Sequence, residues 1–193
     1  MPGDFLKELH TGDLVALFYK TRAEQLRIVI PYIAEGLALN QRCLYITDDT
    51  PVRLILSKLE AAGVDVASAL KRGALDVLTK HETYLRHGGF EAEKMIGDLE
   101  LDTQATLAKG FSGLRGSGDM GWALDRPESI AKMVEYQEKL FHRFPPNFLA
   151  MCQYDETRFS PAVLKRMSQI HSVTIRDGLI ERNSPPLARS QGD

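Results

Sequence analysis

The sequence predicts an α/β fold of three layers, in which a mostly parallel sheet is flanked by helices. Strand-like and helix-like segments alternate along the whole chain. The strand-like segments are continuous apolar runs, as expected for strands that are covered on both faces. Several of these runs end in polar or aromatic residues, and ligands of open α/β sheets bind outside the carboxyl ends of the strands. The pattern therefore predicts both an architecture and a binding edge.

The first half of the chain supplies three of the strands. Its strand-like runs are Leu14–Tyr19, Arg42–Thr47 and Ala74–Thr79. The capping-box pattern from Thr21 to Glu24 starts a helix with apolar positions from Leu26 to Leu37. Thr50 is the expected N-cap of a helix through Leu59, with Pro51 in its first turn, and a short helical segment follows Gly63. The polar loop 80–89 is long enough to lie over a site.

The second half continues the alternation. A helix is expected from Phe90 to Lys109, and Gly110 can terminate it. The stretch Phe111–Leu124 begins as a strand and then breaks into closely spaced glycines. Further elements are a helix from Pro127 to the Phe144-Pro-Pro breaker, a strand at Phe148–Tyr154, a helix from Ser160 to Gln169 and a strand at Ser172–Arg176.

Composition indicates a single soluble domain. The chain has 193 residues, of which 44% are hydrophobic and 26% charged, and its net charge is −2. This balance gives no basic footprint for nucleic acid, so we expect no direct nucleic-acid binding. No apolar run approaches the roughly 20 residues that cross a bilayer, so we expect no membrane contact and a cytoplasmic location. The predicted division is a leader at 1–10, one domain at 11–178 and a flexible tail at 179–193.

Polar and aromatic side chains at the strand ends predict a pocket for a small organic ligand. In a parallel sheet these ends lie along one edge, so residues that are distant in sequence can converge there. The predicted ligand-binding residues are Tyr19, Glu82, Tyr84, Arg115, Asp119, Met120, Trp122, Gln153 and Tyr154. Two alternatives stay open for Asp119, which either contacts ligand or caps a turn and is neutralised by Arg115. Gly116, Gly118 and Gly121 either permit a tight turn or approach a ligand.

A nucleotide site is the main rival. The Lys20-Thr21 pair lies between a strand and a helix, like the end of a phosphate-binding loop. That loop requires glycines and exposed N–H groups, which Phe18 and Tyr19 do not supply. The sequence therefore favours an exposed Lys20 and a Thr21 that caps the helix.

The sequence predicts no catalytic residues, no metal site and no cofactor. His81 and the Glu82–Asp119 carboxylate pair could perform acid–base chemistry, but neither forms a complete catalytic arrangement. The five histidines lack metal-ligand spacing, and Cys43 and Cys152 fall inside apolar strands, where reduced cysteine behaves as a small hydrophobe.

Taken in order, several short motifs resemble the MEDS family of methanogen/methylotroph DcmR-type sensory domains. They are Gly12-Asp13 before Phe18-Tyr19, Arg42–Ile46, Glu82–Tyr84, Gly113–Arg115, Gly118–Ala123, Glu135-Tyr136, Cys152–Asp155 and Arg158-Phe159. The family pattern commonly has a histidine and then a cysteine after its Gly-Asp, where this chain has Leu14 and Ala16. The resemblance runs from Thr11 to Arg176 and implies a RecA-like or KaiC-like fold without a functional phosphate loop.

The resemblance also implies a sensory role, with hydrocarbon-like small molecules as ligands and a histidine kinase or transcription regulator as the output. We therefore expect a stand-alone sensory domain, not an enzyme, that signals through a partner in a separate chain. The alternatives are a degenerate RecA-like nucleotide-binding protein or ATPase, and a homodimeric interaction module.

Overall fold

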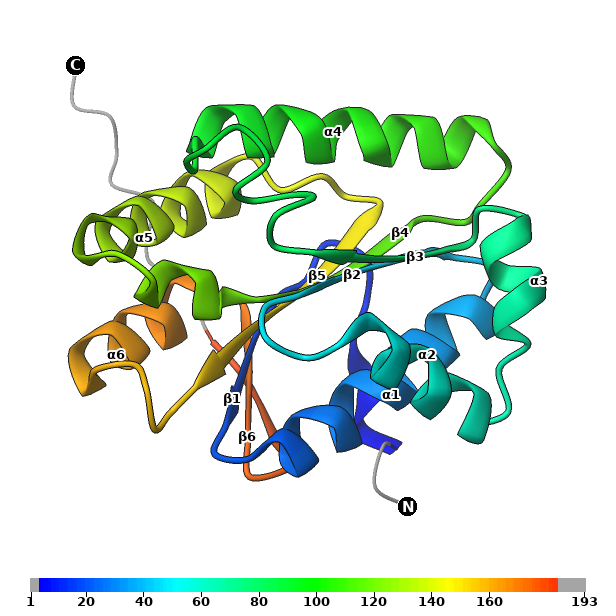
Figure 1. Ribbon diagram of the computed structural model, residues 1–193, viewed down its shortest axis with the longest axis horizontal. Helices are drawn as coiled ribbons and strands as arrows, with labels where there is room; N and C mark the ends of the chain where they lie inside the picture. The colour runs from blue at the N-terminus through cyan, green and yellow to red at the C-terminus, as the bar shows by residue number, and fades with distance from the viewer. Residues whose placement is uncertain (1–3, 184–193) are drawn as a thin grey trace.

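The computed structural model describes residues 4–183, which form one seven-stranded sheet in the order β3-β2-β4-β5-β1-β6-β7 (Figure 1). The first six strands in the chain pair in parallel, and β7 pairs with β6 in the antiparallel sense. The strands are β1 (Leu14–Tyr19), β2 (Arg42–Thr47), β3 (Leu75–Thr79), β4 (Leu114–Asp119), β5 (Phe148–Asp155), β6 (Val173–Arg176) and β7 (Leu179–Arg182). The predicted α/β architecture is confirmed.

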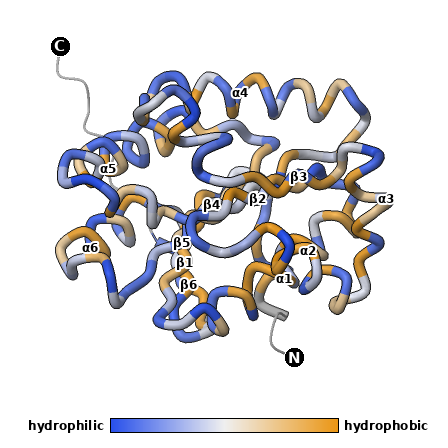
Figure 2. The backbone as a smooth tube through the Cα atoms, viewed as in Figure 1, coloured by the Kyte–Doolittle hydropathy of each residue, from blue (hydrophilic) through white to orange (hydrophobic). Residues whose placement is uncertain are grey.

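Helices cover both faces of the sheet and enclose two separate cores. The helices are α1 (Arg22–Ala38), α2 (Val52–Ala61), α3 (Val66–Lys71), α4 (Ala92–Ala108), α5 (Pro127–His142) and α6 (Pro161–Ile170). One core joins the sheet to α1, α2 and α3, and the other joins it to α4, α5 and α6 (Figure 1). The strands β1, β2 and β5 carry mostly apolar residues, whereas β4 and many connecting segments are less hydrophobic (Figure 2). This division matches strands that are buried on both sides.

Three segments differ from the expectation. Leu179–Arg182, assigned to the flexible tail, is instead the strand β7, because its backbone pairs with β6 across the turn at Asp177-Gly178. The leader contains a 3₁₀ helix, η1 (Asp4–Glu8), and buries Leu6. A second 3₁₀ helix, η2 (Met120–Leu124), follows β4 directly. The remainder of the predicted tail, 184–193, lies outside the described residues.

The helix after β2 also begins differently from the prediction. Its N-cap is Pro51, and no side chain makes a capping hydrogen bond there. Thr50 is the predicted cap, but its backbone carbonyl instead accepts a hydrogen bond of 2.6 Å from the Thr47 hydroxyl. The change fixes the loop between β2 and α2 next to the carboxyl edge of the sheet.

Strand order and register decide which side chains meet at this edge. β1 and β4 both pair with β5, so that Tyr19 aligns with Asp155, and Asp119 aligns with Gln153. Successive residues of a strand point to opposite faces. On β4, the side chains of Arg115, Ser117 and Asp119 therefore share the face of α1, while Gly116 and Gly118 lie on the other.

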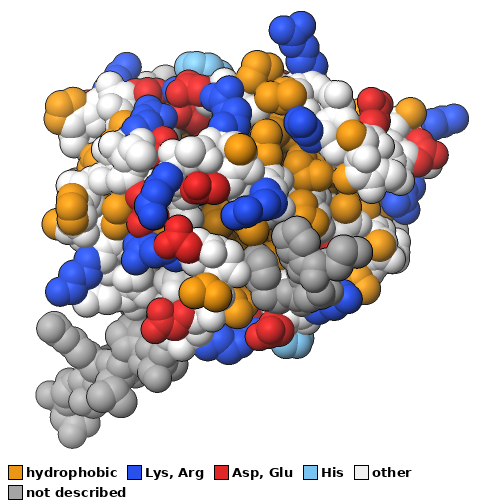
Figure 3. Space-filling model, turned by 90° about the horizontal axis from the view of Figure 1, so that it is seen from below, with side chains coloured by type: hydrophobic (Ala, Val, Ile, Leu, Met, Phe, Trp, Pro, Cys, Tyr) orange, Lys and Arg blue, Asp and Glu red, His pale blue; other side chains and the backbone are white. Residues whose placement is uncertain are grey.

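Within residues 4–183, none of the helices combines the length and apolarity that a membrane-spanning helix needs. Acidic and basic side chains are interspersed over the face drawn in Figure 3, with apolar patches between them. This mixture accords with a net charge of −2.

Candidate functional site

A polar pocket of about 270 Å³ lies at the carboxyl edge of the sheet. It is formed by the ends of β1, β4 and β5, the first turn of α1 and the loop after β2. The lining residues are Tyr19, Arg22, Gln25, Asp48, Asp49, Thr50, Asp119, Asp155 and Arg158. Four of them are aspartates and two are arginines, so the pocket carries more acidic than basic groups.

Asp119 is the buried centre of the hydrogen bonds in this pocket. Its Oδ1 accepts from the backbone N–H of Gly121 at 2.9 Å. Its Oδ2 accepts from Gln25 Nε2 at 2.9 Å and from the Tyr19 hydroxyl at 3.4 Å. All three donors are neutral, and no ion pair joins Asp119 to a lysine, arginine or histidine of the described residues. The predicted neutralisation of Asp119 by Arg115 is absent, whereas the predicted turn cap is present at Gly121.

A chain of amides fixes the position of this carboxylate. Gln25 Nε2 also donates to Gln153 Oε1 at 2.7 Å, and Gln153 Nε2 donates to the Ser117 hydroxyl at 2.8 Å. Ser117 in turn donates to the Met151 carbonyl at 3.2 Å. The amide chain links α1, β4 and β5 beneath the pocket, so these groups are held in place before any ligand enters.

Burial raises the pKa of Asp119 to about 6, because few charges around the carboxyl compensate its lost hydration. The folded protein then binds a proton more tightly than the unfolded chain. The free energy of unfolding should therefore fall as pH rises from about 4 to about 6, by up to about 3 kcal/mol from this group. Asp119→Asn should abolish this part of the pH dependence in denaturant titrations. Asp102→Asn, at an exposed carboxylate on α4, should leave it in place; identical slopes in the Asp119 variant and the parent would contradict the assignment.

Asp48 forms the second buried carboxylate of the pocket, and its side chain is only 1% exposed. Lys80 Nζ lies 2.7 Å from Asp48 Oδ1 and 2.9 Å from Asp125 Oδ2. Arg158 lies farther away, with its Nη1 3.8 Å from Asp48 Oδ2. Lys80 therefore ties the start of the 80–89 loop to the pocket floor.

Gly116, Gly118 and Gly121, in and after β4, leave space for neighbouring side chains. All of them have ordinary negative or extended φ, so a left-handed turn is not their purpose. A Cβ on Gly118 would lie 2.1 Å from the Tyr84 hydroxyl, and one on Gly116 would lie 2.8 Å from the Phe148 ring. On Gly121 it would lie 2.2 Å from Asp48 Oδ2. Each glycine admits a neighbouring side chain of the protein itself.

Gly121→Ala should therefore lower the free energy of unfolding by about 1–3 kcal/mol, because the added methyl group overpacks against a buried, ion-paired carboxylate. Gly97→Ala is the matched control, since Gly97 lies within α4 with open space around its Cα. There the same methyl group should stabilise the protein by about 0.5–1 kcal/mol. Equal effects of the two substitutions in urea unfolding would refute the close contact at Gly121.

The segment after β1 does not form a phosphate-binding loop. The Thr21 hydroxyl accepts from Glu24 N at 3.2 Å, and Glu24 Oε2 accepts from Lys20 N at 2.9 Å. This capping box uses N–H groups that a phosphate would need, and it places a carboxylate at the helix start. Lys20 is half exposed and its Nζ lies 3.4 Å from Asp177. The predicted exposed lysine and capping threonine are confirmed.

Four of the nine predicted ligand-binding residues face the other core. Trp122 is fully buried and stacks on Tyr84 with 5.2 Å between ring centroids, and it contacts Phe90 at 4.4 Å. Met120 and Tyr154 belong to the same core. The structure brings these residues together, but away from the polar pocket. Tyr84, Met120 and Trp122 pack on the side of α4 and α5, and Tyr154 contacts Phe159 and His171 beside α6.

Arg115 and Glu82 lie outside the pocket as well. Arg115 stands at the beginning of β4, where its guanidinium donates to Gln41 Oε1 at 2.6 Å and to the Tyr32 carbonyl at 3.0 Å. Glu82 caps the turn after β3, accepting from the backbone N–H of Thr79 at 2.8 Å. Of the predicted site residues, Tyr19 and Asp119 line the pocket, and Gln153 supports it from below.

The predicted residue set leaves out most of the pocket lining. Asp48 and Asp49 directly follow β2 and Asp155 ends β5, so their positions at strand ends carry a signal in the sequence. Gln25 and Arg22 sit in the first turn of α1, and nothing in their spacing distinguishes them from ordinary helix residues. Only the return of α1 over the carboxyl edge brings Gln25 to Asp119.

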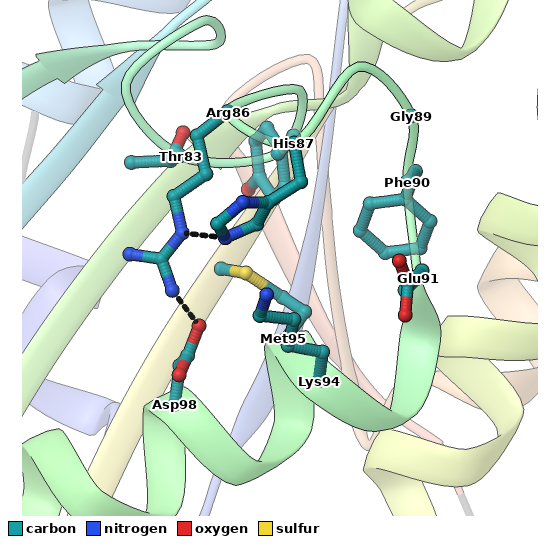
Figure 4. A pocket seen from close by; sticks show the side chains of 10 residues that line it. Thr83, Arg86, His87, Gly89, Phe90, Glu91, Lys94, Met95 and Asp98 are labelled. Atoms are coloured by element: carbon teal, nitrogen blue, oxygen red, sulfur yellow. Dashed lines mark hydrogen bonds and ion pairs between the residues drawn. The ribbon is translucent and has the colours of Figure 1, made fainter.

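Two smaller cavities lie on the side of α4. One of about 20 Å³ lies under the 80–91 segment, where Arg86 reaches between His87 and Asp98 (Figure 4). The other, about 30 Å³, is mostly apolar and lies beside Gly116, Gly118 and Tyr136. A cavity that binds benzene has about 150 Å³, so each of these holds little more than a water molecule.

No three histidine, cysteine or acidic residues of the described chain are placed to hold a metal ion together. Both cysteines are free and buried, and burial raises the pKa of each thiol to about 12. Neither thiol is therefore activated as a nucleophile.

Solved structures with the same architecture include two from Pyrococcus horikoshii. An uncharacterised protein, in complex with an unknown peptide, matches with a TM-score of 0.65 at 14% identity over 89% of this chain and 82% of the other. A KaiC-like protein from strain OT3 matches with a TM-score of 0.59 at 14% identity, over 85% of this chain and 70% of the other. These similarities establish a RecA/KaiC-like fold.

Sequence comparison extends the similarity to a regulator. The transcriptional repressor DcmR of Methylorubrum extorquens is 28% identical over 175 residues, which are 86% of this chain and 62% of the repressor. The chain thus spans about three-fifths of the relative's length. The family model for the methanogen/methylotroph DcmR sensory domain matches residues 15–172, which include every strand end of the pocket. The chain belongs to this family, MEDS.

Proposed function

We propose that this MEDS domain is a sensor that binds a small organic molecule in the polar pocket and passes the signal to a partner, a transcription regulator or a histidine kinase. The observation that carries the proposal is the pocket itself, about 270 Å³ with a prearranged set of polar side chains at the carboxyl edge. Such an edge is the usual ligand site of open α/β sheets. Membership of a sensory family and the similarity to a repressor support a regulatory output.

A hydrocarbon-like ligand is the second candidate class. The aromatic core on the side of α4 would suit it chemically, but the apolar cavity there is only about 30 Å³. A larger apolar ligand would have to displace packed side chains such as Tyr84 and Trp122. The polar pocket needs no such rearrangement, which makes it the better site.

Ligand screening tests the binding part of the proposal. Thermal unfolding of the full chain should respond to members of a panel of small charged and neutral organic compounds. The response should weaken in Arg158→Ala and Asp49→Asn, at the pocket mouth, and persist in Lys132→Ala on α5. A panel without any response, or responses that survive both pocket substitutions, would disprove the site.

Nucleotide titration tests the rival. We expect no heat on adding Mg-ATP or Mg-GTP, because the capping box blocks the phosphate position. ATP binding that disappears in Lys20→Ala would instead establish the degenerate nucleotide-binding protein.

The signalling part of the proposal is tested by gene deletion in the source organism. Deletion of the gene should change the transcript levels that respond to the identified ligand, and the wild-type gene should restore them. The Arg158→Ala gene should not restore the response, while the Lys132→Ala gene should. An unchanged transcript profile after deletion would remove the regulatory role.

A further inference from the structure

The charge arrangement of the polar pocket narrows the chemistry of its ligand. Asp119 is 7% exposed, lines the pocket and lacks a cationic partner among the described residues. Buried carboxylates are ordinarily paired with a cation, because an unpaired buried charge is costly. The Arg158 charge acts on Asp119 from a distance without forming an ion pair, so the carboxylate keeps a position for a directly bound positive charge.

The hydrogen bonds at Asp119 favour one kind of cation. A carboxylate offers about four acceptor positions. Gly121 N uses one of them, and Gln25 and Tyr19 use two on the other oxygen. One position on Oδ1 is left, which matches a single N–H donor. A forked guanidinium needs a free position on both oxygens, so an ammonium group fits better.

The rest of the pocket has the same bias. Asp48, Asp49 and Asp155 add three carboxylates, against Arg22 and Arg158 in the lining and Lys80, whose Nζ lies 2.7 Å from Asp48 Oδ1. Asp155 Oδ1 accepts from Thr157 N at 2.8 Å, and its Oδ2 is not engaged in a hydrogen bond within the described residues. The described carboxylates are too dispersed to hold a metal ion together. The arrangement suits an organic cation that carries its positive charge at one end of the molecule.

We propose that the ligand of this pocket is a small organic amine whose ammonium group forms an ion pair with Asp119. This inference rests on the proposed sensory function and specifies the ligand class of that site. Gln25 and Gln153 hold the carboxylate in position, and the arginines Arg22 and Arg158 at the mouth repel a second cationic group placed near them. The ligand thus has one ammonium end inside and a neutral or acidic end outside.

Matched probes test the charge. n-Butylamine, benzylamine and 4-aminobutyrate are compared with n-butanol, benzyl alcohol and 4-hydroxybutyrate by calorimetry with the full chain at pH 7.5. At least one amine should bind, and its alcohol analogue should bind at least tenfold more weakly. Asp119→Asn should reduce amine affinity by at least tenfold, while Asp102→Asn leaves it unchanged. Circular dichroism and thermal unfolding establish that each variant is folded.

The pH dependence provides a second readout that does not need a variant. The groups facing Asp119 are Tyr19 from β1, Tyr45 from β2, Gln25 and Arg22 from α1, Asp48 and Asp49 from the loop after β2, and Asp155 and Arg158 after β5. Burial raises the pKa of Asp119 to about 6, so protonation removes the charge at lower pH. Amine binding should be roughly tenfold weaker at pH 5 than at pH 7.5.

The outcomes separate this inference from the function on which it rests. Amines that bind no better than their alcohols, or equally well to Asp119→Asn, overturn the ammonium site. If neutral or anionic probes then bind and Arg158→Ala abolishes their binding, the sensory pocket stands with a different ligand class. Binding of MgCl₂ alone at millimolar concentration, with no amine binding, would likewise overturn the inference in favour of a metal.

Discussion

Replacing Trp122 with alanine is expected to lower the free energy of unfolding by about 3–5 kcal/mol in the absence of any ligand. The indole is fully buried between the sheet and the helices on the side of α4. Its ring stacks on Tyr84 and contacts Phe90, with centroids 5.2 Å and 4.4 Å away. Alanine would leave a cavity lined by rings that cannot collapse onto it. Urea unfolding followed by far-UV circular dichroism measures the loss.

The conservative control is Trp122→Phe. It keeps an aromatic ring in the stack and removes an indole N–H that has no hydrogen-bond partner among the described residues. Its cost should therefore be well below that of the alanine variant. A ligand-contacting Trp122 would behave in the opposite way, with little loss of stability and a large loss of binding. A decrease below about 1 kcal/mol for Trp122→Ala would contradict the core role.

The contrast at Trp122 shows what the sequence could predict. The apolar runs located strands such as β1, β2 and β5 closely, because strands that are buried on both faces are mostly apolar, whereas β4 runs through the glycines at which the sequence predicted a break. β7 was missed because its residues Leu179–Arg182 are mostly exposed at the sheet edge and include only two apolar side chains. An edge strand leaves little hydrophobic signal, and its pairing depends on β6.

The predicted site residues divide between the polar pocket and the opposite core. Asp119 ends β4 and Met120 begins η2, yet these neighbours in sequence serve opposite faces of the sheet, one in the pocket and one in the core. The sequence shows that both follow a strand, and it does not show which face carries the ligand. The glycines have the same ambiguity, since only the fold places Tyr84 against Gly118.

Arg115→Ala is expected to destabilise the protein by about 2–5 kcal/mol, although the residue was predicted to contact ligand. The Arg115 side chain is 2% exposed. It packs directly against Gly36 of α1, because a Cβ added to Gly36 would lie only 2.5 Å from Arg115 Cδ. Its guanidinium lies 4.7 Å from the centre of the Tyr32 ring. Alanine would leave the Gln41 side chain and the Tyr32 carbonyl without this donor.

Two variants distinguish the causes of that loss. Arg115→Met retains much of the side-chain volume and removes the charge. Compared with Arg115→Ala, it should therefore recover only the part of the stability that comes from packing. Arg115→Lys retains the charge, but a single ammonium cannot reproduce the planar fork that reaches both Gln41 and the Tyr32 carbonyl. Arg166→Ala, which removes an exposed ion pair with Glu138, is the surface control and should cost less than about 1 kcal/mol.

Because Arg115 stands at the opposite end of β4 from Asp119, its substitution by methionine should leave amine affinity of the folded protein unchanged. A methionine variant that folds normally and loses amine binding would place Arg115 in the ligand site after all.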